Sequence, residues 1–240
     1  MPLKPIRVKS EKEFGRLRDR IDREVSHARH HWSLLKEIEK ARADYSREIN
    51  ESNTFWHLTS IAHRDAVLSH LGRLYDDTNG TLSLSGFLET VRANRNFFSD
   101  EAFRERLKDN PQVENLVRDR PIDDAGLDAE IATVSEPDPL VKALHNLRHK
   151  IIAHTDADVV RRNAPEAHIR WLPLDKIDKL LSRASDITTK YSLYFHGAFY
   201  GGIVGADDFM ATLRWVRKGL AAHDAEIEEQ HKRARELGLL

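Results

Sequence analysis

One stretch of the chain joins an apolar helical pattern to side chains that could handle protons and phosphate groups. It covers residues 140–156, and Arg148, His149, Lys150, His154 and Asp156 are polar residues in its second half. His154 falls on the next position of the apolar stripe, whereas Arg148 and His149 lie beside it. A cation, an imidazole and a carboxylate are unusual residues with which to end a core helix. The stripe itself consists of Leu140, Leu144, Leu147 and Ile151.

These residue types suit the cleavage of RNA without a metal ion. A neutral histidine such as His154 can take the proton from a ribose 2'-hydroxyl, because histidine titrates near neutral pH. An arginine such as Arg148 can hold the adjacent phosphate through two hydrogen bonds and offset negative charge in the transition state. Attack of the hydroxyl on that phosphate would leave a cyclic phosphate end. The stretch therefore predicts Arg148 and His154 as a candidate catalytic pair.

The spacing of this pair indicates a site that two copies of the chain share. On a regular helix, residues six apart are displaced by about 120° in rotation and about 9 Å in rise. Arg148 and His154 of one copy therefore do not form a close pair on a straight helix. Two copies of the helix that cross near a twofold axis could bring two arginines and two histidines into one cleft. We expect a homodimer formed through this helix.

Two other interpretations of these residues stay open. Arg148 could pair with an acidic neighbour, and His154 could bond the free carbonyl groups at the end of its helix. Alternatively, histidines at four-residue spacing could bind zinc. No acidic third ligand lies near His145 and His149, and the chain has no cysteine, so we expect neither a metal nor another cofactor. A second group of histidines on the first predicted helix is His27, His30 and His31.

The segment from Arg148 to His154 resembles the signature of the HEPN superfamily. That signature is an Arg, four to six residues and a His, with a polar residue directly after the Arg. Here five residues intervene, and His149 occupies the polar position, where Asn is more usual. The continuation to Asp156 resembles the abortive-infection, U-type branch of the superfamily. Residues 55–88 are similar to the earlier helices of that branch, and the resemblance spans about residues 32–194.

The resemblance implies an all-α, HEPN-like helical bundle with long antiparallel helices that often dimerises through the motif helix. It also implies a metal-independent endoribonuclease of a phage-defence or toxin–antitoxin system, in which Arg148 contacts phosphate and His154 is catalytic. His149 would support the pair, and Lys150 and Asp156 lie adjacent to it. RNA and an antitoxin or another defence-system protein would be its partners. Catalytically inactive members bind RNA or a partner protein, and that alternative stays open.

Helices must position this stretch, and apolar spacing predicts them along most of the chain. Ser10 and Glu13 form a capping box for a long helix, or two in series, that reaches Ile49. The motif helix begins at about Asp138, and Pro139 suits its first turn. We expect a single domain over residues 1–240, with residues 99–136 as an insertion of short helices and loops. Further predicted elements are helices over residues 53–75, from Ser83 or Ser85, over 175–194 and over 207–237, and an extended segment at 168–172.

Aromatic residues in the C-terminal half of the chain could stack on nucleic-acid bases. At helical spacing such residues are more often part of the core, and that is our interpretation. The residues concerned are Trp171, Tyr191, Tyr194, Phe195, Phe199, Tyr200 and Trp215.

Composition bounds the remaining possibilities. The 240 residues are 40% hydrophobic, enough for the core of one large domain or two small ones. The net charge of −1 provides no global basic field, so nucleic acid must be bound by a local patch or cleft. The absence of cysteine excludes disulfides and cysteine nucleophiles, and it fits a reducing compartment. No apolar run approaches the roughly 20 residues of a membrane span, and we expect a cytoplasmic protein without a membrane partner.

Overall fold

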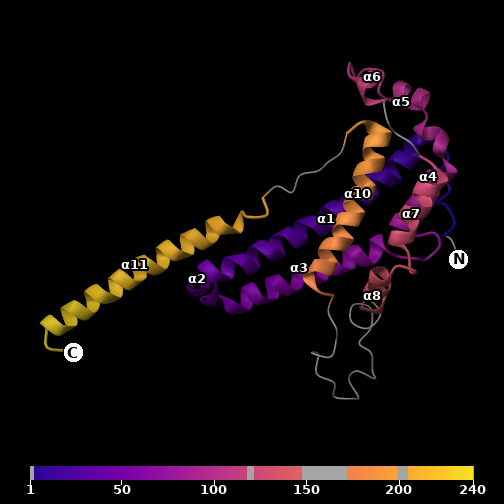
Figure 1. Ribbon diagram of the computed structural model, residues 1–240. Helices are drawn as coiled ribbons and strands as arrows, with labels where there is room; N and C mark the ends of the chain where they lie inside the picture. Colours follow the sequence, from indigo (N-terminus) through magenta and orange to yellow (C-terminus); the bar gives the residue numbers. More distant parts are fainter. Residues whose placement is uncertain (1–2, 118–121, 148–171, 199–204, 240) are drawn as a thin grey trace, which may run out of the picture. The chain divides into compact units, whose positions relative to one another are not determined.

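Long helices account for most of the described chain in the computed structural model (Figure 1). The structure describes residues 3–117, 122–147, 172–198 and 205–239. Within these ranges no strand occurs, and the predicted all-α fold class is confirmed. The helices are α1 (Glu11–Asp44), α2 (Ser46–Asn50), α3 (Asn53–Leu74), α4 (Leu84–Ala93), the 3-10 helix η1 (Arg95–Phe98), α5 (Asp100–Arg106), α6 (Val113–Leu116), α7 (Asp124–Val134), α8 (Pro139–Leu147), α10 (Leu174–His196) and α11 (Phe209–Glu236).

The chain divides into two compact units. Unit 1 contains residues 1–29 and 65–202, and unit 2 contains residues 30–64 and 203–240. Helices α1 and α3 therefore each contribute residues to both units. Each unit has its own buried core.

Side-chain caps fix where the first helix begins. The Ser10 hydroxyl accepts a hydrogen bond from the Glu13 amide at 3.3 Å, and the Glu13 carboxylate accepts one from the Lys9 amide at 2.7 Å. The predicted capping residues are thus confirmed, with the carboxylate reaching one residue further back than in the usual box. The long predicted helix is two helices in series, because the backbone at Tyr45 leaves the helical conformation between α1 and α2.

The third predicted helix is shorter than its apolar pattern. Ser83, and not Ser85, caps α4, since the Ser83 hydroxyl accepts from the Gly86 amide at 3.3 Å. The helix ends at Ala93, and Phe97 and Phe98 belong to the separate 3-10 turn η1. Asn94 ends α4 because its side-chain amide donates to the Thr90 carbonyl at 2.8 Å, a local bond that competes with the helical pattern.

The core of unit 1 contains a cluster of aromatic rings from α1, α4, η1 and α10. Phe14 is fully buried, and its ring centroid lies 5.1 Å from that of Phe195 and 5.3 Å from that of Phe98. Tyr191 packs edge-on against Phe87 at 5.8 Å. Edge-to-face and tilted pairs at these distances are favourable in addition to the burial of the rings. The cluster therefore joins the start of α1 to the second half of α10.

Polar contacts also join α1 to α3 within unit 1. Glu24 is only 8% exposed, and its carboxylate accepts hydrogen bonds from His70, at 2.8 Å, and from Arg73. Burial raises the pKa of Glu24, but the two donors outweigh that effect and hold the pKa below its ordinary value. One carboxylate of α1 thus accepts from two side chains of α3.

Unit 2 has a smaller core built from α1, α2, α3 and α11. Trp56 and Leu213 are buried in it, and the Trp56 ring packs against that of Phe209 with centroids 5.9 Å apart. Arg47 of α2 forms a two-point ion pair with Asp224 of α11, at 2.6 and 2.8 Å. The other members of this core are Ile38, Ala41 and Ile49, with Leu34, Tyr45 and Met210 at its edge.

The short helices predicted between residues 99 and 136 are present as α5, α6 and α7. Helix α7 packs against α4 and α10 and buries Leu127 and Val134. Whether the segment is an insertion in a single domain stays a prediction.

The aromatic residues of the C-terminal half have different environments. Tyr191 and Phe195 are each 1% exposed, as the core interpretation predicts. That interpretation is wrong for Trp215, which is 69% exposed on α11 with Lys218 over its ring at 4.8 Å. Leu213 is the buried residue of this helix, so the apolar side chains of α11 do not all share one face. Trp171, Phe199 and Tyr200 lie outside the described residues, as do residues 168–171 of the predicted extended segment.

None of the helices in the described ranges combines the length and the apolar character needed to cross a membrane.

The imidazole at the end of α10 makes the stability of the fold depend on pH. Burial, followed by the nearby charge of Arg18, lowers the pKa of His196 to about 4. In the unfolded chain the pKa is about 6.5, so protons bind the unfolded chain first. Stability is therefore lost as the pH falls from about 6.5 towards about 4. We expect the free energy of unfolding in urea to fall less steeply over this range for His196→Gln than for the wild type.

A matched control is His231→Gln on α11, since the His231 side chain is exposed. Its pH profile should follow that of the wild type. A His196→Gln profile that runs parallel to the wild type would contradict the assignment.

Candidate functional site

The predicted catalytic pair, Arg148 and His154, lies outside the described residues, and so do His149, Lys150 and Asp156. The described part of the motif helix is α8, which ends at Leu147, immediately before Arg148 in the chain. The structure therefore gives the geometry of the support from which the motif starts.

The apolar face of α8 packs against α10. Val141, Leu144 and Leu147 are its buried residues. Leu140 is only half-buried, so its predicted place in the buried stripe is wrong, and Val141 holds that place instead. Residues three apart along a helix are offset by about 60°, so the buried face of α8 turns gradually from Val141 to Leu147 and leaves Leu140 at its edge.

Asp138 caps the N-terminus of α8. One of its carboxylate oxygens accepts hydrogen bonds from the amides of Leu140, at 2.8 Å, and Val141, at 3.2 Å. The other pairs with the Arg183 guanidinium of α10 at 3.0 Å. Burial raises the pKa of Asp138, yet Arg183 and the two amides together hold the pKa below its ordinary value. A carboxylate at this position also interacts favourably with the helix dipole.

The same guanidinium group reaches a third helix. Nη1 of Arg183 donates to the Thr133 carbonyl at 3.0 Å, near the end of α7. Arg183 therefore joins the last turn of α7 to the first turn of α8, and the short connection between them is held against α10.

His145 fixes α8 to the end of α3. Its Nε2 lies 2.6 Å from the Tyr75 carbonyl oxygen, and a carbonyl can only accept, so the imidazole donates there. Nδ1 faces the Asp77 carboxylate at 3.9 Å. A nitrogen that donates its proton to a carbonyl is not free to bind zinc, so Nε2 of His145 is excluded as a metal ligand.

Tyr75, in turn, is anchored at its side chain. It is fully buried, and its hydroxyl donates to the Leu180 carbonyl of α10 at 2.6 Å. Burial strongly raises the pKa of this phenol, so it stays a neutral donor. The carbonyl that accepts from His145 thus belongs to a residue that is itself held in place.

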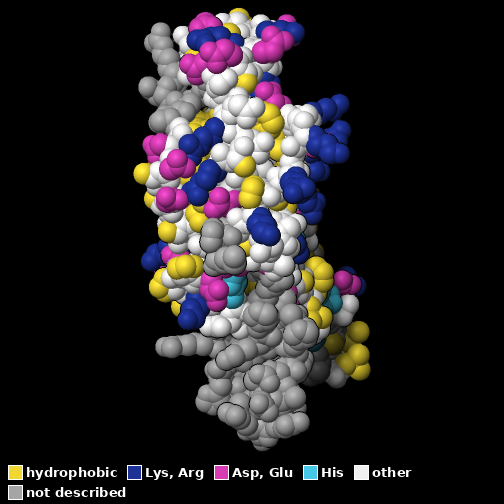
Figure 2. All heavy atoms as spheres, turned by 90° about the vertical axis from the view of Figure 1, so that its right-hand side faces the viewer, with side chains coloured by type: hydrophobic (Ala, Val, Ile, Leu, Met, Phe, Trp, Pro, Cys, Tyr) yellow, Lys and Arg dark blue, Asp and Glu magenta, His cyan; other side chains and the backbone are white. Residues whose placement is uncertain are grey.

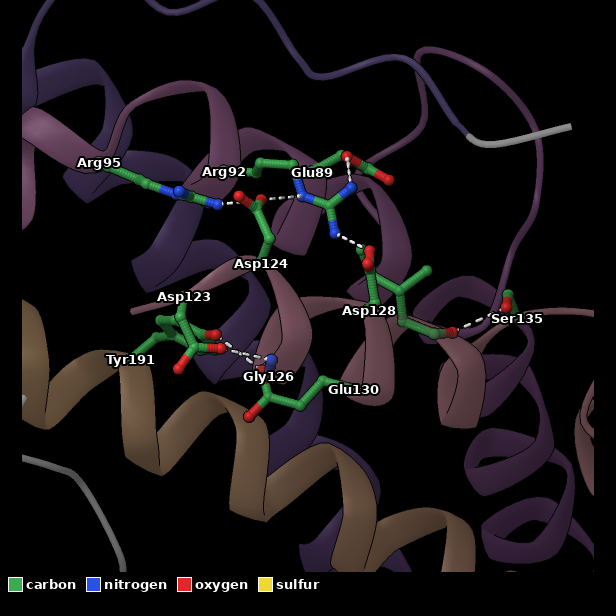
Figure 3. Close-up of polar contacts among 11 residues, drawn as sticks. Glu89, Arg92, Arg95, Asp123, Asp124, Gly126, Asp128, Glu130, Ser135 and Tyr191 are labelled. Carbon is green, nitrogen blue, oxygen red and sulfur yellow. Dashed lines mark hydrogen bonds and ion pairs between the residues drawn. The ribbon is translucent and has the colours of Figure 1, made fainter. Parts of the chain in front are cut away.

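Ion pairs hold α7, the helix before α8, against α4 (Figure 3). Arg92 contacts Asp128 and lies 3.7 Å from Asp124, and Arg95 also contacts Asp124. Hydrogen bonding to Arg95 lowers the pKa of Asp124. These carboxylates are exposed, so each pair is weak by itself, but the shared partners make one network.

Stronger polar contacts join α7 to α10. Glu130 accepts a hydrogen bond from the Tyr191 hydroxyl at 2.7 Å and from the Lys190 ammonium at 2.6 Å. Tyr191 is almost completely buried, and burial is the main cause that raises its pKa. Loss of Glu130 would leave a buried hydroxyl without its acceptor, which is costly.

The histidines of the first helix are brought to α3 rather than to one another. In unit 2, Nδ1 of His31 lies 2.8 Å from Nδ1 of His63. In unit 1, the rings of His27 and His70 are 5.7 Å apart. Within the described ranges, no three or more His, Asp or Glu side chains are grouped so that they could hold a metal ion.

The face of the molecule drawn in Figure 2 carries charges of both signs. On the face drawn in Figure 2, Lys and Arg side chains occur together with Asp and Glu side chains and with hydrophobic ones. This agrees with the nearly neutral composition. Phosphate binding by this protein therefore needs a local concentration of cations.

Sequence reasoning missed the residues that support α8 from other helices. The pair Asp138-Pro139 is a cap signal that could be read from the chain. Nothing in the sequence pairs Arg183 with Asp138, or His145 with the Tyr75 carbonyl, because these contacts join positions 45 and 70 residues apart.

The Asp138 cap should make a measurable contribution to stability. Asp138→Ala removes the acceptor for two amides and the partner of Arg183, and we expect a loss of about 1–2 kcal/mol in the free energy of unfolding. Asp175→Ala, in the first turn of α10, is the matched control because that carboxylate is exposed and lies 4.0 Å from Lys179. Its effect should stay within about 0.5 kcal/mol. Equal effects in urea unfolding would refute the capping role.

Comparison with known proteins gives one family. No curated protein and no solved structure matched the chain. A family model, described as AbiU2 and belonging to the HEPN group, matches residues 11–227. This range includes most of both units, the α8 support and the Arg148-to-His154 segment. The chain therefore belongs to the AbiU2 family of HEPN proteins.

Proposed function

We propose that this protein is a metal-independent endoribonuclease of an abortive-infection or toxin–antitoxin system, acting in the cytoplasm on RNA. The observation that carries the proposal is the Arg148-to-His154 motif within a chain of the AbiU2 family. The motif begins one residue after α8, a helix that is capped by Asp138 and bonded to α3 and α10. Such a support suits a catalytic group that must be held in place.

The reaction would be an internal transfer of the phosphate. Neutral His154 takes the proton of a ribose 2'-hydroxyl, the 2'-oxygen forms a bond to the neighbouring phosphorus, and the bond from phosphorus to the 5'-oxygen breaks. A proton from an imidazole of the same cleft goes to the leaving 5'-oxygen. The products are a 2',3'-cyclic phosphate and a 5'-hydroxyl. Arg148 holds the nonbridging oxygens and offsets their charge as the transition state forms.

The site would be shared by two copies. Arg148 and His154 are separated by about 120° and about 9 Å on a regular helix, so one copy supplies only part of a cleft. A twofold contact through the motif helix would provide two arginines and two histidines. These cations would supply the local charge that the mixed surface of Figure 2 does not. His149 and Lys150 would add to it, with Asp156 as an orienting partner of an imidazole.

Cleavage in the presence of EDTA tests the chemistry. We expect the wild type to cut single-stranded RNA without metal and to leave 2',3'-cyclic phosphate ends. His154→Ala should lose about 100-fold or more in rate, as expected for the loss of a general base. His231→Ala, at an exposed histidine of α11, should retain full activity. A substrate with 2'-O-methyl groups should resist the wild type, since its 2'-oxygen carries no proton to remove.

Two results would overturn the assignment. One is equal cleavage by the wild type and His154→Ala. The other is no cleavage of diverse RNAs by a folded, dimeric wild type; that result would favour the alternative, an inactive HEPN module that binds RNA or a partner protein.

Mixing variants tests whether the site is shared. Arg148→Ala and His154→Ala should each be inactive alone. When the two are coexpressed and copurified, the mixed dimer keeps one Arg148 and one His154 in the common cleft, so we expect part of the cleavage activity to return. Each variant coexpressed with itself is the control. Continued inactivity of a verified mixed dimer would exclude a composite site.

A further inference from the structure

A cavity of about 670 Å³ lies beside the first turn of α8. The residues that follow α3, the start of α4, the end of α7 and the N-terminal residue Leu3 form its wall, all within unit 1. The N-terminal segment is held at this wall because the Lys4 amide donates to the Asn79 side chain at 2.9 Å. The volume of the cavity is within the range of small-molecule sites. The polar residues of the wall are Asp77, Asn79, Ser85, Ser135, Glu136 and Lys142.

Only some of these polar groups are used within the protein. The Ser135 hydroxyl donates to the Ile131 carbonyl at 2.7 Å. One oxygen of Asp77 accepts from the Glu136 amide at 2.9 Å and faces His145. These bonds fix the wall and leave other groups available.

The remaining groups have no partner among the described residues. The second oxygen of Asp77, Oδ1, is buried without a hydrogen bond. Ser85 is only 3% exposed, and its hydroxyl makes no hydrogen bond to the part of the chain that the structure describes. Lys142 and Glu136 are exposed, and within the same residues neither forms an ion pair. Unsatisfied polar groups around a cavity are costly unless water or a ligand bonds to them.

The charges indicate which ligand fits. The wall contains two carboxylates, Asp77 and Glu136, and one ammonium group, Lys142, so it carries net negative charge. An anion such as a free phosphate would meet this charge unfavourably. A cationic group could pair with the carboxylates, while an acidic group at the other end of the same molecule could reach Lys142.

We propose that this cavity binds a basic amino acid, a small molecule with a guanidinium or ammonium group at the end of its side chain and a carboxylate at the other end. Its cationic end contacts Asp77 and Glu136, and its carboxylate contacts Lys142. The Ser85 hydroxyl and the Asn79 amide, whose oxygen is already used by Lys4, supply further hydrogen bonds. Burial raises the pKa of Asp77, and a bound cation would oppose that effect.

This site is independent of the proposed RNA cleavage, but it adjoins the motif helix. Glu136 and Lys142 flank Asp138, the cap of α8, and Asp77 faces His145 of the same helix. A ligand that engages these residues would stabilise the start of α8 by binding the folded state.

Titration calorimetry with the full-length protein tests the proposal, with L-arginine and L-lysine as probes. We expect saturable binding of at least one probe at one site per chain. L-citrulline, which has the shape of L-arginine but a neutral side chain, and L-glutamate, whose side chain is an anion, should bind at least about tenfold more weakly, because each lacks the charge-assisted bond of a side-chain cation. Failure of both basic probes to saturate, or equal binding of L-citrulline, would overturn the proposal.

Variants of the wall locate the site. Asp77→Asn keeps an acceptor for the Glu136 amide, and it should weaken the binding of L-arginine by about tenfold or more. Asp109→Asn, at an exposed carboxylate of unit 1, is the matched control and should bind as the wild type does. Lys142→Gln should weaken the binding of L-arginine. It should leave the affinity for L-argininamide, which lacks the carboxylate, unchanged. Unchanged affinity of a folded Asp77→Asn would show that the ligand binds elsewhere.

Discussion

The Arg183 guanidinium joins three helices next to the predicted catalytic motif. From α10 it pairs with Asp138 at the start of α8 and donates to Thr133 near the end of α7. Arginine suits this role because its donors have a fixed planar geometry and its charge is permanent. The Tyr75 hydroxyl and the His145 imidazole extend the support from α10 through α3 to α8. Helix α8 is therefore held at its cap and at its last described turn by independent bonds.

Local signals predicted much of this fold. Ser10 with Glu13, and Ser83, were readable as caps because a hydroxyl or carboxylate bonds an amide only a few residues away. The long apolar repeats predicted α1, α3 and α10, because side chains three or four residues apart lie on one face of a helix. Contacts between distant segments were not readable: no pattern marks His70 and Arg73 as the partners of Glu24, nor separates the buried Val141 from the half-buried Leu140.

For the candidate site, the sequence predicted the family and the motif but not the residues that support α8. The family follows from a short motif and a matching order of helices, and the match over residues 11–227 confirms it. The supporting shell could not follow from the sequence, because Asp138, Arg183 and Tyr75 are each ordinary in their local context. These residues support α8 only once α10 packs beside it. Trp215 is a case in which the local pattern gave a wrong prediction. Its helical spacing predicted a place in the core, but its side chain is exposed to solvent.

The passage of α1 and α3 through both units has a consequence for how such a chain can vary in length. In unit 1 the two helices run antiparallel, with Glu24 beside His70 and Arg73, and in unit 2 Arg42 lies beside Ser60. In each unit the segments of α1 and α3 therefore pair with one another. Adding or removing whole turns of about 3.6 residues from both segments of unit 2 would keep each face in register. The support of α8 lies within unit 1 and would stay the same.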